Sequence, residues 1–277
     1  MATDTVSPTL PGGSGGSSRL FVGQVESLDP IMGDAMLVSV RVPRTVAQQL
    51  RPGRFFEITC RHETTFDPLL RRPFSVYRVD RERGSLVFLI RPFGRGSGWM
   101  ARRKVGDELD VLGPLGNAYE TSPTTRNLVL VAGGVGVAPM VMMADEAAAK
   151  GVNVAFLMGA ANERGLLPAA ELPSSVEYVV ATDDGSKGFH GFVTQLARDY
   201  VQWADQIMAC GPEPMYRSLR DAINPIRLNG RPPVQVSMER GMACGVGACL
   251  GCVVETKRGM RTACLDGPVF DLDEVLW

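Results

Sequence analysis

The sequence predicts a multidomain protein with three parts: a small antiparallel Greek-key β-barrel, an α/β domain with a parallel sheet, and a small cysteine-rich module at the end. Three observations predict this order. Short β-rich runs broken by turn residues fill the first hundred residues. An apolar strand then runs into a glycine-rich turn and a helix, and four of the six cysteines fall within 21 positions near the end. We expect the parts at 19–120, 124–230 and 231–277, after a tail at 1–18.

The composition excludes several classes of function. The net charge is −1, so the chain lacks the basic excess typical of proteins that bind nucleic acid or anionic membranes. No apolar run reaches the roughly 20 residues of a membrane span. Residues 1–18 are rich in Gly, Ser, Thr and Pro and carry neither a signal-peptide nor a transit-peptide pattern, which predicts a disordered tail and a cytoplasmic protein.

The barrel is predicted from five short runs with Pro-Gly or Arg-Gly breaks between several of them. The expected strands are Leu20–Leu28, Ala35–Val42, Phe55–Cys60, Phe74–Val79 and Ser85–Arg91. The segment Gly113–Asn117 has the composition of a turn. Cys60, alone in its strand, is expected to be a small core residue.

Two motifs of the barrel have the chemistry of a phosphate site. In Arg71–Val76, an arginine leading into a strand can hold a phosphate with two hydrogen bonds, and Ser75 can hydrogen-bond a ring nitrogen. In Arg91–Gly98, three glycines let the backbone approach an anion before a helix begins. A solvated strand edge and a flexible loop are the alternative interpretations.

The middle of the chain reads as a nucleotide-binding α/β domain. The run Leu128–Pro139 is an apolar strand, a Gly-Gly-Val-Gly turn and the start of a helix that continues to Lys150. This turn departs from the G-x-G-x-x-G fingerprint, and no acidic residue lies near position 156. Further strands are expected at Asn153–Gly159, Val176–Ala181 and Asp205–Cys210, and helices at Gly191–Gln202 and Pro212–Ala222.

Two strand ends of this domain are candidate ligand contacts, because open α/β sheets bind ligands at the carboxyl ends of their strands. They are Thr182–Ser186 and Cys210–Met215. A plain turn with a helix cap is the alternative for each. Cys210 has no nearby His or Lys in the sequence, so a catalytic thiolate is not supported.

The four clustered cysteines have the spacing C-x4-C-x2-C-x11-C, which begins like the plant-type [2Fe-2S] pattern. Gly245, Gly247 and Gly251 allow positive φ, so the loop can wrap closely around a cluster, and backbone N–H groups can then hydrogen-bond the sulfurs. A zinc site more often has two C-x2-C pairs, and a disulfide framework belongs to small secreted domains. Thiolates kept for a cluster indicate a reducing compartment.

Taken together, the motifs of this chain resemble those of the ferredoxin–NADP reductase superfamily. They are Arg-Pro-Phe-Ser, Gly-Arg-Gly-Ser, Gly-Gly-Val-Gly-Val-Ala-Pro, Cys-Gly-Pro-Glu-Pro-Met, the four cysteines and Asp-Gly-Pro-Val-Phe. Within it, residues 19–277 are similar to electron-transfer subunits of NAD-dependent dihydroorotate dehydrogenase B. The resemblance implies FAD on the barrel, with Arg72 on its phosphate and Ser75, the catalytic residue, near the reactive flavin nitrogen. Phe74 replaces a tyrosine that many relatives carry, which keeps stacking and removes a hydroxyl.

The resemblance also implies which residues bind each group. The cofactor-binding residues are Arg72, Pro73, Phe74, Ser75, Arg91, Gly94, Gly96, Ser97, Gly133, Gly134, Gly136, Asp183, Cys210, Gly211, Pro212 and Met215. The cluster ligands are Cys244, Cys249, Cys252 and Cys264. The implied cofactors are therefore FAD, a [2Fe-2S] cluster and NAD.

The implied function is an electron relay. The sequence agrees with it because it offers no acid–base set of residues: its only histidines, His62 and His190, lie outside the motifs. An FMN-containing partner subunit would oxidise dihydroorotate in pyrimidine biosynthesis, within a heterotetramer. One alternative is an NAD(P)H oxidoreductase subunit of a ferredoxin-NADP reductase, sulfide dehydrogenase or hydrogenase complex. Another is a metal-stabilised module with vestigial nucleotide sites. NADP also remains open, since Lys187 and Arg217 are candidate phosphate contacts.

Overall fold

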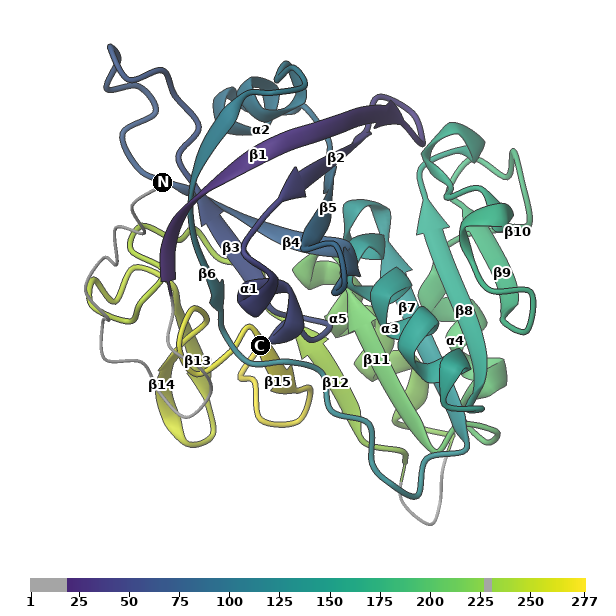
Figure 1. Cartoon of the computed structure of the whole chain (residues 1–277). Helices are drawn as coiled ribbons and strands as arrows, with labels where there is room; N and C mark the ends of the chain where they lie inside the picture. Colours follow the sequence, from purple (N-terminus) through teal and green to yellow (C-terminus); the bar gives the residue numbers. More distant parts are fainter. Residues whose placement is uncertain (1–18, 227–230) are drawn as a thin grey trace.

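The computed structural model describes residues 19–226 and 231–277 (Figure 1). The predicted tail at 1–18 lies outside the described residues. Figure 1 shows the barrel, the large sheet with its helices, and the C-terminal module, which lies against both of them. The order and kind of the three parts are as the sequence predicts.

The first part is a closed antiparallel barrel with strand order β1-β2-β5-β4-β3-β6. Its strands are β1 (Arg19–Pro30), β2 (Met36–Arg41), β3 (Phe55–Ile58), β4 (Arg72–Asp80), β5 (Ser85–Ile90) and β6 (Glu108–Leu115). The five predicted runs all contain strands, whereas β6 was missed. The prediction of a turn at Gly113–Asn117 was wrong for Gly113–Leu115, which belong to β6. Pairing with β1 and β3 makes this segment extended, and that pairing closes the barrel.

Two short helices accompany the barrel, α1 (Arg44–Gln48) and α2 (Arg95–Ala101). The predicted glycine-rich loop therefore already belongs to helix α2 from Arg95 onward. Gly94 is extended and precedes the first turn of α2. The loop is thus shorter than its composition suggested.

The second part is a seven-stranded sheet with order β10-β9-β8-β7-β11-β12-β15. Its strands are β7 (Asn127–Gly133), β8 (Asn153–Ala160), β9 (Glu177–Thr182), β10 (Phe189–His190), β11 (Gln206–Cys210), β12 (Val234–Ser237) and β15 (Val269–Asp271). All neighbours are parallel except β12 and β15. The four strands predicted for this domain are present. The sequence analysis missed the short strands β10, β12 and β15, because strands of so few residues show no alternation of apolar and polar side chains.

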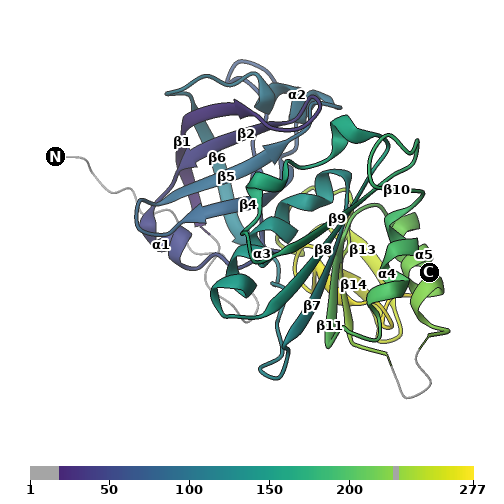
Figure 2. The same ribbon diagram turned by 90° about the vertical axis from the view of Figure 1, so that its right-hand side faces the viewer.

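Helices cover both faces of this sheet (Figure 2). They are α3 (Val137–Ala149), α4 (Val193–Tyr200) and α5 (Glu213–Ile223), close to the predicted helices, together with the 3-10 turns η1 (Gly134–Gly136), η2 (Glu163–Gly165) and η3 (Ala169–Glu171). Helix α3 is buried along most of its length because it lies between the sheet and barrel strand β4. Helices α4 and α5 pack on the opposite face, one beside the other.

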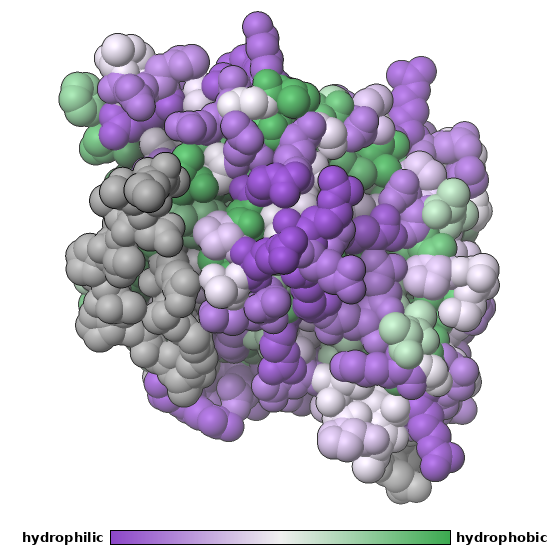
Figure 3. Space-filling view, in the orientation of Figure 1, coloured by the Kyte–Doolittle hydropathy of each residue, from purple (hydrophilic) through white to green (hydrophobic). Residues whose placement is uncertain are grey.

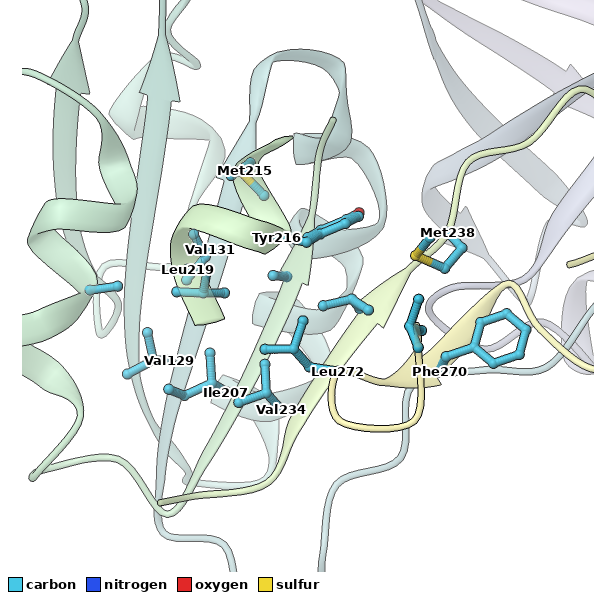
Figure 4. Close-up of a cluster of buried hydrophobic side chains, with 14 of the residues drawn as sticks. Val129, Val131, Ile207, Met215, Tyr216, Leu219, Val234, Met238, Phe270 and Leu272 are labelled. Carbon is cyan, nitrogen blue, oxygen red and sulfur yellow. The ribbon is translucent and has the colours of Figure 1, made fainter. Parts of the chain in front are cut away.

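A continuous apolar core lies between α5, the sheet and the C-terminal module (Figure 4). Tyr216 and Leu219 of α5 pack with strand residues such as Ile207, and Met238 and Phe270 extend the cluster toward the module. Burial of these side chains from water is the main force that joins the parts.

The C-terminal module consists of the cysteine loop, the hairpin β13 (Val253–Thr256) and β14 (Gly259–Thr262), and strand β15. Since β15 pairs with β12, the module shares a sheet with the α/β domain. Asn117, which follows β6, holds the module to the barrel: its Nδ2 donates to the carbonyls of Asp266 (3.0 Å) and Val269 (2.8 Å).

The face seen in Figure 3 is mostly hydrophilic, with hydrophobic side chains in separate patches. None of the helices in the described ranges has the length and apolar character of a membrane-spanning segment.

Candidate functional site: an arginine at a helix start, a strand-end pocket and a cysteine loop

The predicted phosphate-binding arginine of the barrel lies against the N-terminal turn of helix α2. A Cβ placed on Gly96 would come within 2.7 Å of the Arg72 Cγ and 3.3 Å of its Nε. Position 96 therefore has to be glycine for the Arg72 side chain to lie across the helix start. The Arg72 guanidinium is also oriented by its neighbours, because its Nη1 donates to the carbonyls of Leu70 (2.8 Å) and Arg71 (3.0 Å). The arrangement suits a phosphate held between an arginine and backbone N–H groups.

Ser97 has a structural role in this loop. Its Oγ accepts hydrogen bonds from the backbone N–H groups of Gly94 (3.0 Å) and Phe93 (3.3 Å). The hydroxyl thus holds the loop in the shape that leads into helix α2, which is the work of a local cap.

Ser75 and Phe74 lie on β4, opposite Phe55 and Phe56 of β3. Phe74 packs partly against the barrel core, and Ser75 is half-buried. The Ser75 hydroxyl makes no hydrogen bond with another described residue. It is therefore free to bind an added group.

A pocket of about 520 Å³ opens at the carboxyl ends of the sheet strands. This volume is within the range of about 300–1,000 Å³ that is usual for small-molecule sites. It brings together eight of the predicted residues: Arg91, Gly133, Gly134, Gly136, Asp183, Gly211, Pro212 and Met215. The predicted strand-end contacts are thus assembled from β7, β9 and β11, which lie at separate places in the sequence.

The glycine turn after β7 meets the segment after β11 at very close range. A Cβ on Gly136 would lie 2.3 Å from the carbonyl oxygen of Cys210. Only glycine fits there, so the two strand ends form one continuous pocket floor. Cys210 itself is buried and does not line the pocket, and burial raises the pKa of its thiol well above the ordinary value. Its structural contribution is the backbone that Gly136 approaches.

Sequence reasoning missed four polar or aromatic residues of the pocket wall: Phe192, Thr194, Ser218 and Glu239. The hydroxyls of Thr194 and Ser218 share a hydrogen bond of 2.9 Å between α4 and α5. These residues lie in segments without a recognisable motif, so only the tertiary structure could assign them.

The two candidate contacts for an NADP phosphate are each paired with a carboxylate. Lys187 Nζ lies 3.0 Å from Glu163 Oε1, and Arg217 Nη2 lies 2.8 Å from Glu213 Oε1. Neither Lys187 nor Arg217 is among the residues that line the pocket.

The cysteine loop has the backbone donors that a sulfur cluster needs. The N–H of Gly247 donates to Cys264 Sγ (3.1 Å), that of Gly251 to Cys249 Sγ (3.4 Å) and that of Val246 to Cys244 Sγ (3.5 Å). Gly245 and Gly247 have positive φ as predicted, but Gly251 does not, and Leu250 takes that conformation instead with φ 55°. The residues present fit a thiolate-bound cluster.

The thiols differ in electrostatic environment. Burial opposes ionisation of Cys244, but N–H groups of Val246, Cys249 and Ala248 outweigh it and lower the pKa to about 7. Burial and the neighbouring Cys252 raise the pKa of Cys264 to about 12. No three His, Cys, Asp or Glu side chains of the described chain converge as ligands of one metal ion. A [2Fe-2S] cluster requires only two protein sulfurs at each iron.

A buried carboxyl that no sequence motif indicates lies between the barrel and this loop. Glu57 of β3 is fully buried, and neither carboxyl oxygen has a hydrogen-bond partner among the described residues. A Cβ on Gly245 would lie 2.8 Å from the Glu57 Cγ, so strand β3 touches the loop directly. Burial raises the pKa of Glu57 to about 7, with Arg71 opposing the rise.

Comparisons with known proteins agree with this geometry. Residues 239–276 match the model of the iron-sulfur cluster binding domain of dihydroorotate dehydrogenase B, and residues 130–221 match the oxidoreductase NAD-binding domain. The chain is also similar to a chain in the solved structure of the NADH-dependent reduced ferredoxin-NADP oxidoreductase. The two share 28% sequence identity with a TM-score of 0.79, and the match covers 92% of this chain and 90% of that one.

Two curated relatives are named dihydroorotate dehydrogenase B (NAD(+)), electron transfer subunit. The protein of Desulforamulus reducens is 36% identical over 94% of this chain and 99% of its own length. That of Geobacillus thermodenitrificans is 38% identical over 83% of this chain and 89% of its own length. With this identity over most of its length, the chain belongs to the family of dihydroorotate dehydrogenase B (NAD(+)) electron transfer subunits.

Proposed function

We propose that this chain passes electrons from dihydroorotate, oxidised on the FMN of a partner subunit, through a [2Fe-2S] cluster and FAD to NAD+. It is an oxidoreductase subunit of pyrimidine biosynthesis, working in the cytoplasm and assembled with its partner as a heterotetramer. The family membership supports the reaction and the need for a partner.

One structural observation carries the proposal: the three sites share a single packed core. Phe55, which pairs with Ser75 of the flavin strand, belongs to the same buried cluster as Met215 of the pocket and as Cys252 and Cys264 of the loop. Electron transfer between groups requires that they be held near one another in a fixed arrangement. The shared core supplies this arrangement within one chain.

The residues have separate roles in this function. Arg72 and the start of helix α2 hold the FAD phosphates, and Ser75 presents a free hydroxyl to the flavin. Gly136 and its neighbours bind the dinucleotide, and the four cysteines bind the cluster. Bound FAD supplies the exchange between hydride transfer with nicotinamide and single-electron transfer with the cluster. The protein contributes position and electrostatics, and no general base is needed.

The test is an anaerobic visible absorption spectrum of the purified chain, with iron, sulfide and flavin assays on the same sample. Flavin bands with a [2Fe-2S] shoulder are expected, at about one FAD and two irons per chain, and NADH should bleach the spectrum. A colourless protein that holds zinc would contradict the proposal. Co-purification with a dihydroorotate-oxidising FMN subunit tests the partner, and stable assembly with a different redox enzyme would reject it.

A further inference from the structure

Strand β3 places one carboxyl side chain against the C-terminal module. In a strand, successive side chains point to opposite faces. Phe56 and Ile58 point into the barrel core, so Glu57 points outward, on the same face as Phe55. Phe55 packs in the buried cluster that also contains the expected ligand Cys264. The outer face of β3 is therefore covered by the C-terminal module, and Glu57 lies on this covered face.

Gly245 lets the cysteine loop approach this carboxyl. It directly follows Cys244, and its φ of 71° is a left-handed conformation that favours glycine. A Cβ on Gly245 would lie 2.8 Å from the Glu57 Cγ and 3.6 Å from its carboxyl carbon. A side chain at position 245 would therefore push the loop away from β3. With glycine there, the carboxyl lies close to the backbone that carries the first expected cluster ligand.

The carboxyl has an unused hydrogen-bonding group. Glu57 is fully buried, and among the described residues neither of its oxygens takes part in a hydrogen bond. The two nearby arginines are engaged elsewhere: Arg71 Nη2 lies 2.7 Å from Asp110 Oδ2, and Arg72 Nη1 donates to backbone carbonyls. A buried carboxylate without hydrogen bonds or a bound cation is costly, so the neutral acid is the favoured form. The neutral acid has one O–H donor.

A thiolate-bound cluster supplies an acceptor for this donor. Its sulfurs carry negative charge and accept hydrogen bonds. Negative charge nearby also disfavours ionisation of a carboxyl, so a bound cluster helps Glu57 to keep its proton. Backbone N–H groups of the C-terminal module already donate to the cysteine sulfurs. Glu57 can add a side-chain donor from the barrel.

We propose that Glu57 is a neutral hydrogen-bond donor to the sulfurs of the cluster and that it raises the reduction potential of the cluster. Hydrogen bonds to the sulfurs stabilise the extra negative charge of the reduced cluster, so each donor makes reduction easier. The inference rests on the proposed function, since it assigns a barrel residue to the cluster of that electron path. It gives strand β3, which pairs with the strand of Ser75, a direct effect on the cluster.

The experiment compares side chains that keep or lose the donor. Glu57→Gln keeps a donor in its amide, whereas Glu57→Met is similarly unbranched and has none. The reduction potential of the cluster is measured on the full chain with its flavin and cluster, by anaerobic redox titration followed by electron paramagnetic resonance. The pH is about 6, below the pKa of about 7 that burial gives Glu57. Glu57→Met should lower the equilibrium constant for one-electron reduction of the cluster about tenfold, equal to about 59 mV toward more negative potential, whereas Glu57→Gln should stay within about twofold of the wild type.

Two further variants complete the set. Glu57→Leu is a second side chain without a donor, so the test does not depend on the folding of one variant, and the iron content of each protein is measured beside its potential. Glu255→Leu is the matched control. Glu255 is an exposed carboxyl on β13 of the same module, and its loss should leave the potential unchanged because solvent screens its charge.

An unchanged potential in Glu57→Met and Glu57→Leu would overturn the inference, because the carboxyl would then have no effect on the cluster. A shift of Glu57→Gln toward more positive potential would also overturn it, since the substitution would then have removed an ionised carboxylate. A wild-type chain without an iron–sulfur cluster would instead contradict the proposed function. The two failures are therefore distinguishable.

Discussion

At the scale of single residues, Glu57 shows how a functional junction can contain a destabilising group. A buried carboxyl without partners is costly when ionised. Its pKa rises from 4.5 to about 7 because burial disfavours the charge. The folded chain therefore keeps this proton over a pH range in which the unfolded chain has released it.

The sign of the pH dependence follows from this shift. The contribution of Glu57 to the free energy of unfolding is most favourable below about pH 4.5, and it falls as the pH rises to about 7. The shift corresponds to about 3 kcal/mol at most. Glu57→Gln cannot ionise, so it should match the wild type at pH 4 and exceed its free energy of unfolding at pH 8. Chemical denaturation at both pH values measures this, and equal stabilities at pH 8 would contradict it.

At the scale of elements, Arg78 ties strand β4 to the α/β domain. Arg78 Nε lies 2.8 Å from Asp145 Oδ2 of helix α3, and its Nη1 lies 2.7 Å from Glu171 Oε2 of η3. The Tyr77 hydroxyl donates to the same Glu171 oxygen at 2.8 Å. Since β4 carries Ser75 and α3 begins at the glycine turn, this network sets the orientation of β4 relative to the pocket at the strand ends.

Arg78→Met should lower the free energy of unfolding by about 1–3 kcal/mol, because two half-buried carboxylates lose their partner. Arg41→Met is the matched control. Among the described residues, Arg41 pairs only with Glu26 of the same barrel and is half exposed, so its loss should cost less than about 1 kcal/mol. Denaturant titration of both variants is the measurement. Equal losses of unfolding free energy in the two variants would show that the Arg78 network stabilises the fold no more than an exposed ion pair does.

At the scale of the whole molecule, one substitution can separate the function of the C-terminal module from that of the dinucleotide pocket. Cys249 is the exposed cysteine of the loop and is not part of the pocket. Cys249→Ser should abolish electron delivery from the partner subunit to NAD+, while NADH should still bleach the bound flavin at the wild-type rate. Stopped-flow absorbance measures the second reaction directly.

Cys60→Ala is the matched control for this experiment, because Cys60 is buried in the barrel core away from the loop. It should keep its iron content and its transfer to NAD+. Unimpaired transfer in Cys249→Ser would remove the cluster from the electron path.

Much of this architecture is readable in the chain itself. Strands such as Phe55–Ile58 and Asn153–Ala160 show as apolar runs, and the residues of the glycine turn and the cysteine spacing are adjacent in sequence. The short strands β12 and β15 carry too few residues to show a period. They become strands only because an existing sheet edge supplies their hydrogen-bond partners.

The sequence by itself determined the three parts, the two glycine loops and the cysteine pattern, because each depends on residues close together in the chain. The tertiary structure alone decided the contacts made across long separations. It placed Glu57 against Gly245, Gly136 against Cys210, and Glu239 in one pocket with Asp183. Such contacts depend on how strands are ordered and how domains pack, and no local pattern of residue types records that order.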